Sequence, residues 1–297
     1  MDFMLTLIAS SIPLSAGHVA QTGKFMEDQG VMMTGNPYWL ANHKAVDIPL
    51  AQSLTLEQMK SLRALLDEHK IDSLCTRTDG RRKKLLMADM DSTIVTSETL
   101  DELAAEAGIK DKIAAITERA MRGELDFHEA LKKRISLLKG LSAECLQKTL
   151  EQTEISSGAA ELVATMRQNG GFCALVSGGF TYFTAAIAAQ LGFTAHHGNV
   201  LNIENGVLAG DVQEPILDKN SKLSFLKLYC EELDIALEDT VAIGDGANDL
   251  PMLSAAGLGM GYHPKPLLEE TLLNCIRHTD LTSVLYAQGY KDEEIAK

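Results

Sequence analysis

Apolar residues follow two different rhythms along the first 80 residues of the chain. Thr55–Lys70 places leucines and a methionine three or four positions apart, which predicts an amphipathic helix. Gly17–Gly30 predicts another helix that ends at its last glycine. Short apolar runs predict strands at Phe3–Ser10, Val31–Thr34, Ala45–Leu50 and Ile71–Thr78. The resulting β-α-β-β-α-β order predicts a small ferredoxin-like α+β domain over residues 1–80.

From residue 84 onward, the pattern changes to fully apolar strands that alternate with helices. Leu85–Ala88 is a continuous apolar run, which is typical of a strand covered on both faces of a parallel sheet. Further strands are predicted at Phe172–Val176, Thr240–Ile243 and Gly257–Gly261, with helices at Gly158–Asn169 and Thr181–Leu191. This alternation predicts a doubly wound α/β domain over residues 84–297.

A helical insertion is predicted at about residues 99–153, between the first two strands of that domain. Thr99–Glu102 has the form of a capping box, and Asp126–Glu129 resembles one. Because the insertion leaves from the carboxyl end of a strand, it is placed to act as a lid over that edge of the sheet.

The net charge and the lengths of the apolar runs argue against a nucleic-acid-binding protein and against a membrane-spanning one. The 297 residues carry a net charge of −14, so the chain lacks the broad basic face that nucleic-acid binding needs. The basic run Arg81–Lys84 has the composition of a localisation signal, but a solvated linker before a buried strand is the favoured interpretation. No apolar run is long enough to span a membrane.

Five cysteines are widely spaced and form no C-x-x-C pair, so they are predicted to be buried thiols in a reducing compartment. The apolar stretch Phe3–Ala9 is short and follows Asp2 rather than basic residues. We therefore interpret it as a strand and not as a secretion signal, and expect a cytoplasmic protein.

Two carboxylates stand just past the first strand of the α/β domain, in the sequence Asp89-Met90-Asp91. The carboxyl ends of parallel strands are where such sheets bind ligands. One carboxylate can attack phosphorus, and a neighbouring acid can protonate the leaving alkoxide. The alternative is an acidic turn that caps the next helix.

A second acidic motif follows the strand Thr240–Ile243, at Asp245-Gly246-Ala247-Asn248-Asp249. Asp245 and Asp249 supply the hard oxygen ligands that Mg²⁺ prefers. A simple glycine turn would have the same local sequence, so the motif gains weight from its place at a strand end in the same sheet as Asp89.

Two weaker signals lie between these motifs. Ser177-Gly178-Gly179 follows another strand, where a hydroxyl and free backbone N–H groups can hold phosphate. Lys222 lies near the start of a predicted helix and could neutralise a transferring phosphoryl group. Alone, the triplet is an ordinary loop and the lysine an ordinary surface residue.

In this order, the four motifs resemble those of the haloacid dehalogenase superfamily of phosphohydrolases. The resemblance covers the chain from about Lys84 to its end. Within that superfamily, the chain resembles the phosphoserine phosphatases at the first motif through Glu98, at Met121-x-Gly123-x-Leu125-x-Phe127, and at Arg134-x-Ser136-Leu137-Leu138.

The resemblance implies a role for each motif. Asp89 is the implied nucleophile and Asp91 the proton donor that later acts as base. Mg²⁺ is implied to bind Asp89, the backbone carbonyl of Asp91 and Asp245, with Asp249 in close support. The implied phosphate-binding residues are Ser177, Gly178, Lys222 and Asn248.

The resemblance also implies the substrate, O-phospho-L-serine, and with it the last step of serine biosynthesis. Glu98 is implied to bind the amino group of the substrate and Arg134 its carboxylate, a pairing that suits a zwitterion. Without the resemblance, the favoured interpretation of Glu98 is an acid that stabilises the first turn of a helix, and that of Arg134 is one of a basic surface trio with Lys132 and Lys133.

Two alternatives remain open at the level of sequence. The enzyme could act on another small phosphate ester, or pass the phosphoryl group to an alcohol instead of water. The region 1–80 resembles the ACT-like domains that some phosphoserine phosphatases carry. Such domains often bind amino acids or mediate dimers, so we expect this one to set the oligomeric state, with a homodimer as the simplest case.

Overall fold

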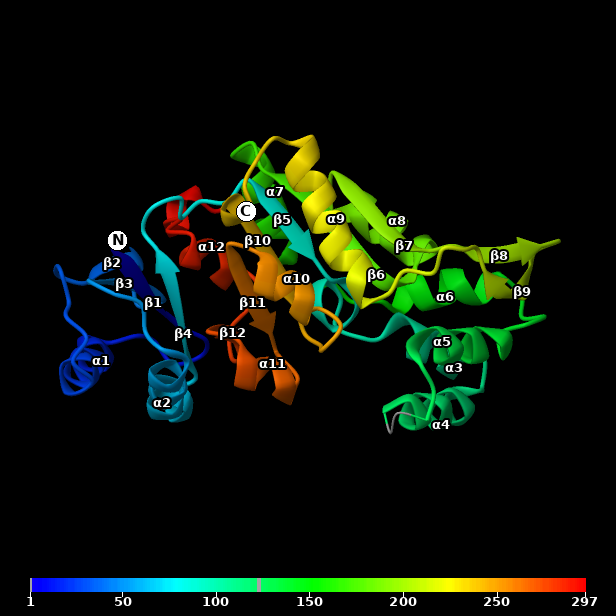
Figure 1. Ribbon diagram of the computed structural model, residues 1–297, viewed down its shortest axis with the longest axis horizontal. Coiled ribbons are helices and arrows are strands. Elements are labelled where there is room, and N and C mark those ends of the chain that lie inside the picture. The colour runs from blue at the N-terminus through cyan, green and yellow to red at the C-terminus, as the bar shows by residue number, and fades with distance from the viewer. Residues whose placement is uncertain (1, 122–123) are drawn as a thin grey trace.

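The computed structural model describes residues 2–121 and 124–297. In it, an antiparallel sheet and a larger parallel sheet lie side by side, and a group of helices extends from the far side of the parallel sheet (Figure 1). The N-terminal sheet and its helices occupy the blue end of the molecule in that view, and the helical group is drawn in green.

The N-terminal sheet has four strands in the order β2-β3-β1-β4, and its paired strands are antiparallel. Leucine and isoleucine side chains from one face of the sheet pack against Met26 of the first helix and Met59 of the second. The elements are β1 (Phe3–Ala9), α1 (Ala16–Asp28), β2 (Tyr38–Ala41), β3 (Ala45–Leu50), α2 (Leu56–Leu66) and β4 (Ile71–Arg77). The predicted α+β order is therefore confirmed.

One predicted strand is wrong. Val31–Thr34 contributes only an isolated bridge between Met33 and Leu50, and the second strand is Tyr38–Ala41 instead. The tight turn before β3 decides the pairing, because His43 adopts a positive φ of 57° there and returns the chain beside β3. Pro37 lies between the two segments and cannot donate a ladder hydrogen bond.

The larger sheet has six parallel strands in the order β12-β11-β10-β5-β6-β7. Its strands are β5 (Leu85–Ala88), β6 (Phe172–Phe180), β7 (Ala195–Asn199), β10 (Thr240–Gly244), β11 (Leu258–Tyr262) and β12 (Asn274–Ile276). The helices between and after them are α7 (Ala159–Gln168), α8 (Thr181–Leu191), α9 (Lys219–Glu232), α10 (Leu250–Ala255), α11 (Pro266–Thr271) and α12 (Ser283–Ala287).

Apolar cores cover both faces of the central strand β5. Leu86 and Ala88 belong to one cluster of buried side chains, and Leu85 and Met87 belong to another. Successive side chains of a strand point to opposite faces, so a strand buried on both sides needs an unbroken apolar run. The predicted α/β fold class is confirmed by this sheet.

Of the α-helices described between β5 and β6, the first four form the cap, and a β-hairpin supports it (Figure 1). The hairpin contacts the loop after the third cap helix: the Gly140 N–H donates to the Leu208 carbonyl at 2.8 Å, and the Leu208 N–H donates to the Leu141 carbonyl at 2.9 Å. These elements are α3 (Thr99–Glu106), α4 (Lys110–Met121), α5 (Phe127–Ser136), α6 (Glu144–Gln152), β8 (Leu201–Glu204) and β9 (Val207–Val212).

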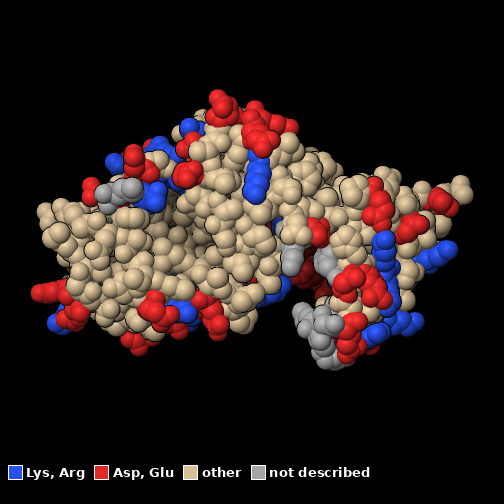
Figure 2. Space-filling model, in the orientation of Figure 1, with Lys and Arg blue, Asp and Glu red and all other residues tan. Residues whose placement is uncertain are grey.

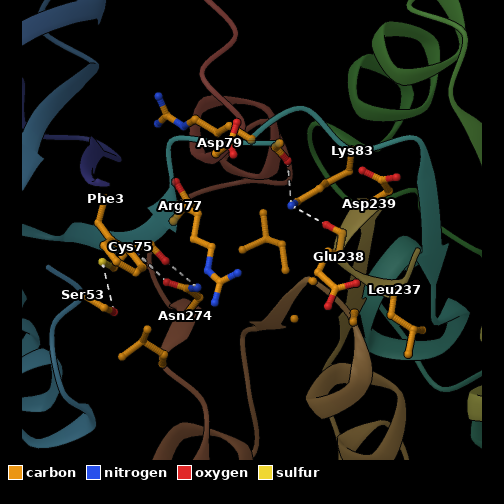
Figure 3. A pocket seen from close by; sticks show the side chains of 18 of the residues that line it. Phe3, Ser53, Cys75, Arg77, Asp79, Lys83, Leu237, Glu238, Asp239 and Asn274 are labelled. Atoms are coloured by element: carbon orange, nitrogen blue, oxygen red, sulfur yellow. Dashed lines mark hydrogen bonds between the residues drawn. The ribbon is translucent and has the colours of Figure 1, made fainter. Parts of the chain in front are cut away.

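The two sheets meet at their edge strands β4 and β12, where one amide side chain joins them. The Asn274 side chain accepts a hydrogen bond from the Cys75 N–H at 2.7 Å and donates one to the Cys75 carbonyl at 3.1 Å (Figure 3). An open cleft of about 860 Å³ lies beside this contact, between the two sheets.

The basic run before β5 is not simply a solvated linker, because Arg81 is half-buried and contacts Asp47 of β3. Two nitrogens of Arg81 contact the two Asp47 oxygens at 2.5 and 2.8 Å, and its Nε donates to the Ala287 carbonyl at 2.9 Å. Asp47 is fully buried, and a buried carboxylate needs a cationic partner. Apolar packing crosses the same junction, since Ile8 and Tyr286 share one core cluster.

Charged side chains are unevenly spread over the surface. In the view of Figure 2, most of the face over the N-terminal sheet is free of charge, while acidic and basic side chains gather at its margins and on the cap. All five cysteines are free thiols; four are buried, and Cys145 is half-buried. None of the helices in the described part of the chain is long and apolar enough to cross a membrane.

Candidate active site

Asp89 is buried at the carboxyl end of β5, in the middle of the parallel sheet. Its backbone N–H donates to the Ile243 carbonyl of β10 at 3.0 Å, so strand pairing holds the acid in place. One side-chain oxygen, Oδ1, accepts the Met90 N–H at 2.8 Å. The chain then turns sharply, with Ser92 at a positive φ of 54°, and leaves toward the cap.

Lys222 brings a buried cation to this acid from the first turn of α9. Its Nζ lies 2.6 Å from Asp89 Oδ1 and 2.5 Å from Asp249 Oδ1. Burial and the neighbouring Asp249 raise the pKa of Asp89 well above its ordinary value, although Lys222 opposes this. Burial alone would lower the pKa of Lys222, but Asp89 and Asp249 together raise it, so the lysine stays charged.

The loop after β10 brings two more carboxylates to Asp89. Asp249 Oδ2 accepts the N–H groups of Asp245 at 3.1 Å and Gly246 at 3.0 Å. This close approach requires Gly244, because a Cβ there would lie 2.4 Å from the Asp249 carboxyl carbon. One oxygen from each of Asp89, Asp245 and Asp249 lies within 4.8 Å of the others.

Three buried carboxylates around one point fit a divalent cation with oxygen ligands. Without a cation they repel each other: burial raises the pKa of Asp245, with Asp249 adding to the effect and Lys265 opposing it. The donor set therefore supports a metal site, as the family resemblance implies, and is compatible with more than one hard cation.

Asp91 lies beside the first acid and is held by three hydrogen bonds. Its Oδ1 accepts the Thr99 backbone N–H at 2.8 Å and the Thr99 hydroxyl at 2.7 Å, while its Oδ2 accepts the Ser177 hydroxyl at 2.8 Å. Burial and Glu98 raise the pKa of Asp91 and these bonds oppose the rise. The predicted capping box at Thr99 is therefore wrong, because its hydroxyl serves Asp91 and Glu98 occupies the cap position without a side-chain bond.

The phosphate-binding candidates surround these acids. The Ser177 hydroxyl donates to Asp91 and accepts the Gly179 N–H at 2.8 Å, and the Gly178 carbonyl accepts the Asn199 side chain at 2.8 Å. Asn248 is exposed at the rim, with its amide nitrogen 3.5 Å from Asp249 Oδ1. The structure thus gathers the residues of all four motifs at one edge of the sheet.

Glu98 and Arg134 lie farther out, on the cap side. Glu98 Oε1 accepts the Ser92 hydroxyl at 3.0 Å. Arg134, on α5, is half-buried, and its Nε is fully buried without a hydrogen-bond partner among the described residues. Burial lowers the pKa of Arg134, while Asp101 and Glu98 oppose that effect. The side chains of Met121 and Phe127, and Gly123 altogether, lie outside the described residues.

Two residues at the site were missed from the sequence. Thr99 holds Asp91, and Lys265 contacts both Asp245 at 2.9 Å and Glu98 at 3.5 Å. Lys265 follows the carboxyl end of β11, so the strand-end argument that found Asp89 could have found it too. Thr99 gave no such signal, because its spacing to Glu102 satisfied a common helix-start pattern.

Comparison with known proteins places the chain in a family. The sequence pattern of haloacid dehalogenase-like hydrolases matches residues 86–254. Phosphoserine phosphatase of Saccharomyces cerevisiae is 32% identical over 99% of this chain and 98% of its own. The chain belongs to the phosphoserine phosphatase family of haloacid dehalogenase-like hydrolases. Phosphoserine phosphatase SerB2 of Mycobacterium tuberculosis is 42% identical over 72% of this chain, and the match spans only about half, 53%, of that longer protein.

Solved structures agree with this assignment. A probable phosphoserine phosphatase from Vibrio cholerae, unliganded, covers 99% of this chain and 88% of its own with a TM-score of 0.79 and 30% identity. A phospho-aspartyl intermediate analogue of phosphoserine phosphatase covers 69% of this chain and 98% of its own with a TM-score of 0.64 and 40% identity.

Proposed function

We propose that this chain hydrolyses O-phospho-L-serine to L-serine and phosphate, the last step of serine biosynthesis. The observation that carries the proposal is Asp89, a buried carboxylate at a strand end that shares Lys222 with Asp249 and lies in a three-carboxylate cluster. A carboxylate in this position can attack phosphorus, and the neighbouring Lys222 can bind the phosphoryl oxygens. The relatives that share these motifs are phosphoserine phosphatases.

Asp89 carries the first chemical step. Its Oδ1 is held by Met90 and Lys222, and no hydrogen bond among the described residues reaches Oδ2. This free oxygen attacks phosphorus, the bond to the serine oxygen breaks, and an aspartyl-phosphate forms on Asp89. Lys222 stays beside the reacting carboxylate and offsets negative charge on the phosphoryl oxygens.

Asp91 moves the protons. Its raised pKa favours the protonated form more than an exposed aspartate would, so it can give a proton to the departing serine alkoxide. When the aspartyl-phosphate is hydrolysed, Asp91 takes a proton from a water molecule and the water oxygen attacks phosphorus. The bond between phosphorus and the Asp89 oxygen then breaks, and phosphate is released. Thr99 and Ser177 fix the carboxyl group for both transfers.

The metal proposed for the carboxylate cluster is Mg²⁺. Asp89 and Asp245 would hold it together with the backbone carbonyl of Asp91, and Asp249 would support them through Asp245 N–H and Lys222. When bound, Mg²⁺ supplies positive charge opposite the phosphoryl oxygens. Ser177, Gly178 and Asn248 would complete the phosphate site.

Selectivity for phosphoserine is assigned to Glu98 and Arg134. A buried guanidinium nitrogen without a partner is costly unless a ligand satisfies it, and a planar carboxylate is the anion that best suits arginine. Glu98 offers the opposite charge, which suits the amino group of the same ligand. Together they distinguish a zwitterionic ester from a plain phosphate ester.

A phosphate-release assay across a panel of small phosphate esters tests the function. We expect L-phosphoserine to be among the best substrates by kcat/KM in the presence of Mg²⁺. A preference for another ester would reject the substrate, and release into added alcohols would favour phosphotransfer. The homodimer and the cytoplasmic location remain predictions; light scattering measures the former and fractionation the latter.

A further inference from the structure

Lys265 lies between the metal-binding carboxylates and the cap, in the loop that joins β11 to α11. Its backbone N–H donates to the Asp245 carbonyl at 2.8 Å, which fixes the start of its side chain beside the acidic cluster. The ammonium then lies 2.9 Å from Asp245 Oδ2 and 3.5 Å from Glu98 Oε1. Through Lys265, a core strand and the entry to the cap are joined by one cation.

Each of these contacts engages only one oxygen of its carboxylate. On Glu98, both Ser92 and Lys265 contact Oε1, and no hydrogen bond or ion pair within the described ranges reaches Oε2. On Asp245, Lys265 contacts Oδ2, and no hydrogen bond or ion pair from those same ranges reaches Oδ1. A carboxylate held at one oxygen keeps a fixed orientation and presents the other oxygen to a ligand.

We propose that Lys265 is a positioning residue that orients Asp245 toward the bound cation and Glu98 toward the ammonium group of the substrate. This assignment rests on the proposed function, because it gives Glu98 that ligand. Lys265 thereby links the occupancy of the metal site to the selectivity for an amino-acid phosphate. It touches neither the phosphorus nor the leaving group, so it acts through the two acids.

The ordinary alternative is a solvent-exposed lysine whose ion pairs have little effect. The Lys265 side chain is 56% exposed, and exposed ion pairs contribute little. Asp245 is only 6% exposed, however, and the backbone bond from Lys265 to the same residue keeps the pair together. Two anchors on one loop distinguish this lysine from a freely moving one.

Binding of Mg²⁺ to metal-free protein, measured by calorimetry, tests whether Lys265 orients Asp245 toward the cation. Lys265→Met keeps an unbranched side chain that is one atom shorter and removes the cation, so Asp245 loses its orientation. We expect the dissociation constant to rise about three- to tenfold, at or just below the lower end of the effects seen for partners of metal ligands, because the lysine is partly exposed. Lys265→Arg keeps a cation and should recover most of the affinity.

Steady-state kinetics test whether Lys265 orients Glu98 toward the ammonium group of the substrate. They are measured at a Mg²⁺ concentration well above the dissociation constant of each variant. For Lys265→Met, we expect KM for L-phosphoserine to rise about three- to tenfold with kcat changed less than twofold. The KM for phenyl phosphate, which has no ammonium group, should change less than twofold. Lys265→Arg should again lie closer to the wild type.

The control is Lys84→Met, which removes an exposed lysine paired with Asp239 at 3.0 Å before β5. It should match the wild type in both experiments. A Lys265→Met protein that keeps wild-type values in either measurement overturns the two-sided role, as does equal loss on both substrates. Failure of the proposed function is separate: the wild type itself would then not prefer phosphoserine over phenyl phosphate.

Discussion

The ammonium of Lys222 lies 2.6 Å from the carboxylate of Asp89, and both groups are buried at the same edge of the parallel sheet. The same ammonium contacts Asp249 at 2.5 Å. The protein itself therefore offsets part of the negative charge around the nucleophile. An incoming phosphate would therefore meet a cation that the protein itself holds in place.

Asp89→Asn should abolish turnover while the protein stays folded. An amide is not a competent nucleophile toward phosphorus, but it has the size of the acid and can still contact its neighbours. Phosphate release and the thermal unfolding midpoint measure the two parts of this prediction. Turnover within tenfold of the wild type would contradict the assignment of Asp89 as the nucleophile. The control is Asp79→Asn, which changes an exposed aspartate near the sheet junction and should leave turnover unchanged.

Arg134→Ala should reduce kcat/KM for phosphoserine about 10- to 100-fold, the range expected for one charged hydrogen bond. Phenyl phosphate, which lacks a carboxylate, should lose much less. Steady-state kinetics on both esters provide the measurement. Arg119→Ala on α4 removes an exposed cap arginine and should leave both values near wild type. Equal losses for Arg134→Ala on both esters would mean that Arg134 contacts phosphate or supports the cap.

Metal binding should release protons, and more of them as the pH falls. The pKa values of Asp89 and Asp245 are raised in the metal-free protein, first of all by burial, so these acids retain protons at higher pH than exposed ones. A cation binds only the deprotonated forms, so lowering the pH through the raised pKa values weakens Mg²⁺ binding. Calorimetry in buffers of different ionisation heats counts the protons. A pH-independent affinity from neutral down to the ordinary carboxyl range would contradict this.

The raised pKa values also determine how the stability of the folded protein changes with pH. An acid whose pKa is raised by folding stabilises the folded protein most when protonated, and this contribution is lost as the pH rises through the folded pKa. Asp89→Asn removes one such acid. The variant's unfolding midpoint should therefore gain relative to the wild type as the pH rises, when both are measured without metal. A constant difference between the two proteins would argue against strained carboxylates at the site.

Arg81→Ala should destabilise the fold by about 3–5 kcal/mol, because Asp47 would remain buried without its cation. The change removes contacts to β3 and to the Ala287 carbonyl at once. Chemical denaturation monitored by circular dichroism gives the free energy of unfolding. Lys84→Ala, which breaks only an exposed pair with Asp239, should cost less than about 1 kcal/mol. A similarly small effect for Arg81→Ala would show that the buried pair is dispensable.

The sequence predicted most of what depends on local pattern. Asp89 and Asp245 could be assigned to one edge because both directly follow buried parallel strands, and such ends meet in space. The error at Val31–Thr34 has a local cause as well, since short apolar runs near glycine and proline suit several roles. Burial, by contrast, depends on partners far along the chain. Arg81 appeared as part of a charged linker because Asp47 lies 34 positions before it.

Lys265 illustrates the same limit at the site. The loop that carries it reaches Asp245 because β11 lies next to β10 in the sheet, and strand neighbours are not written in chain order. Thr99 was missed for a different reason: its hydroxyl had two plausible hydrogen-bond partners, a backbone N–H donor at the helix start and the Asp91 carboxylate as acceptor, and only the fold decides between them. Residues that support a site are therefore harder to predict than residues that react.

The amide of Asn274 has a consequence beyond joining two sheets. A strand at the edge of a sheet presents unpaired backbone groups on which another chain can assemble. Asn274 pairs with both the N–H and the carbonyl of Cys75, as a neighbouring strand would. These two backbone groups of β4 are therefore not available to another chain. We therefore expect the junction between the sheets to disfavour the pairing of β4 with another chain, in addition to joining the two sheets.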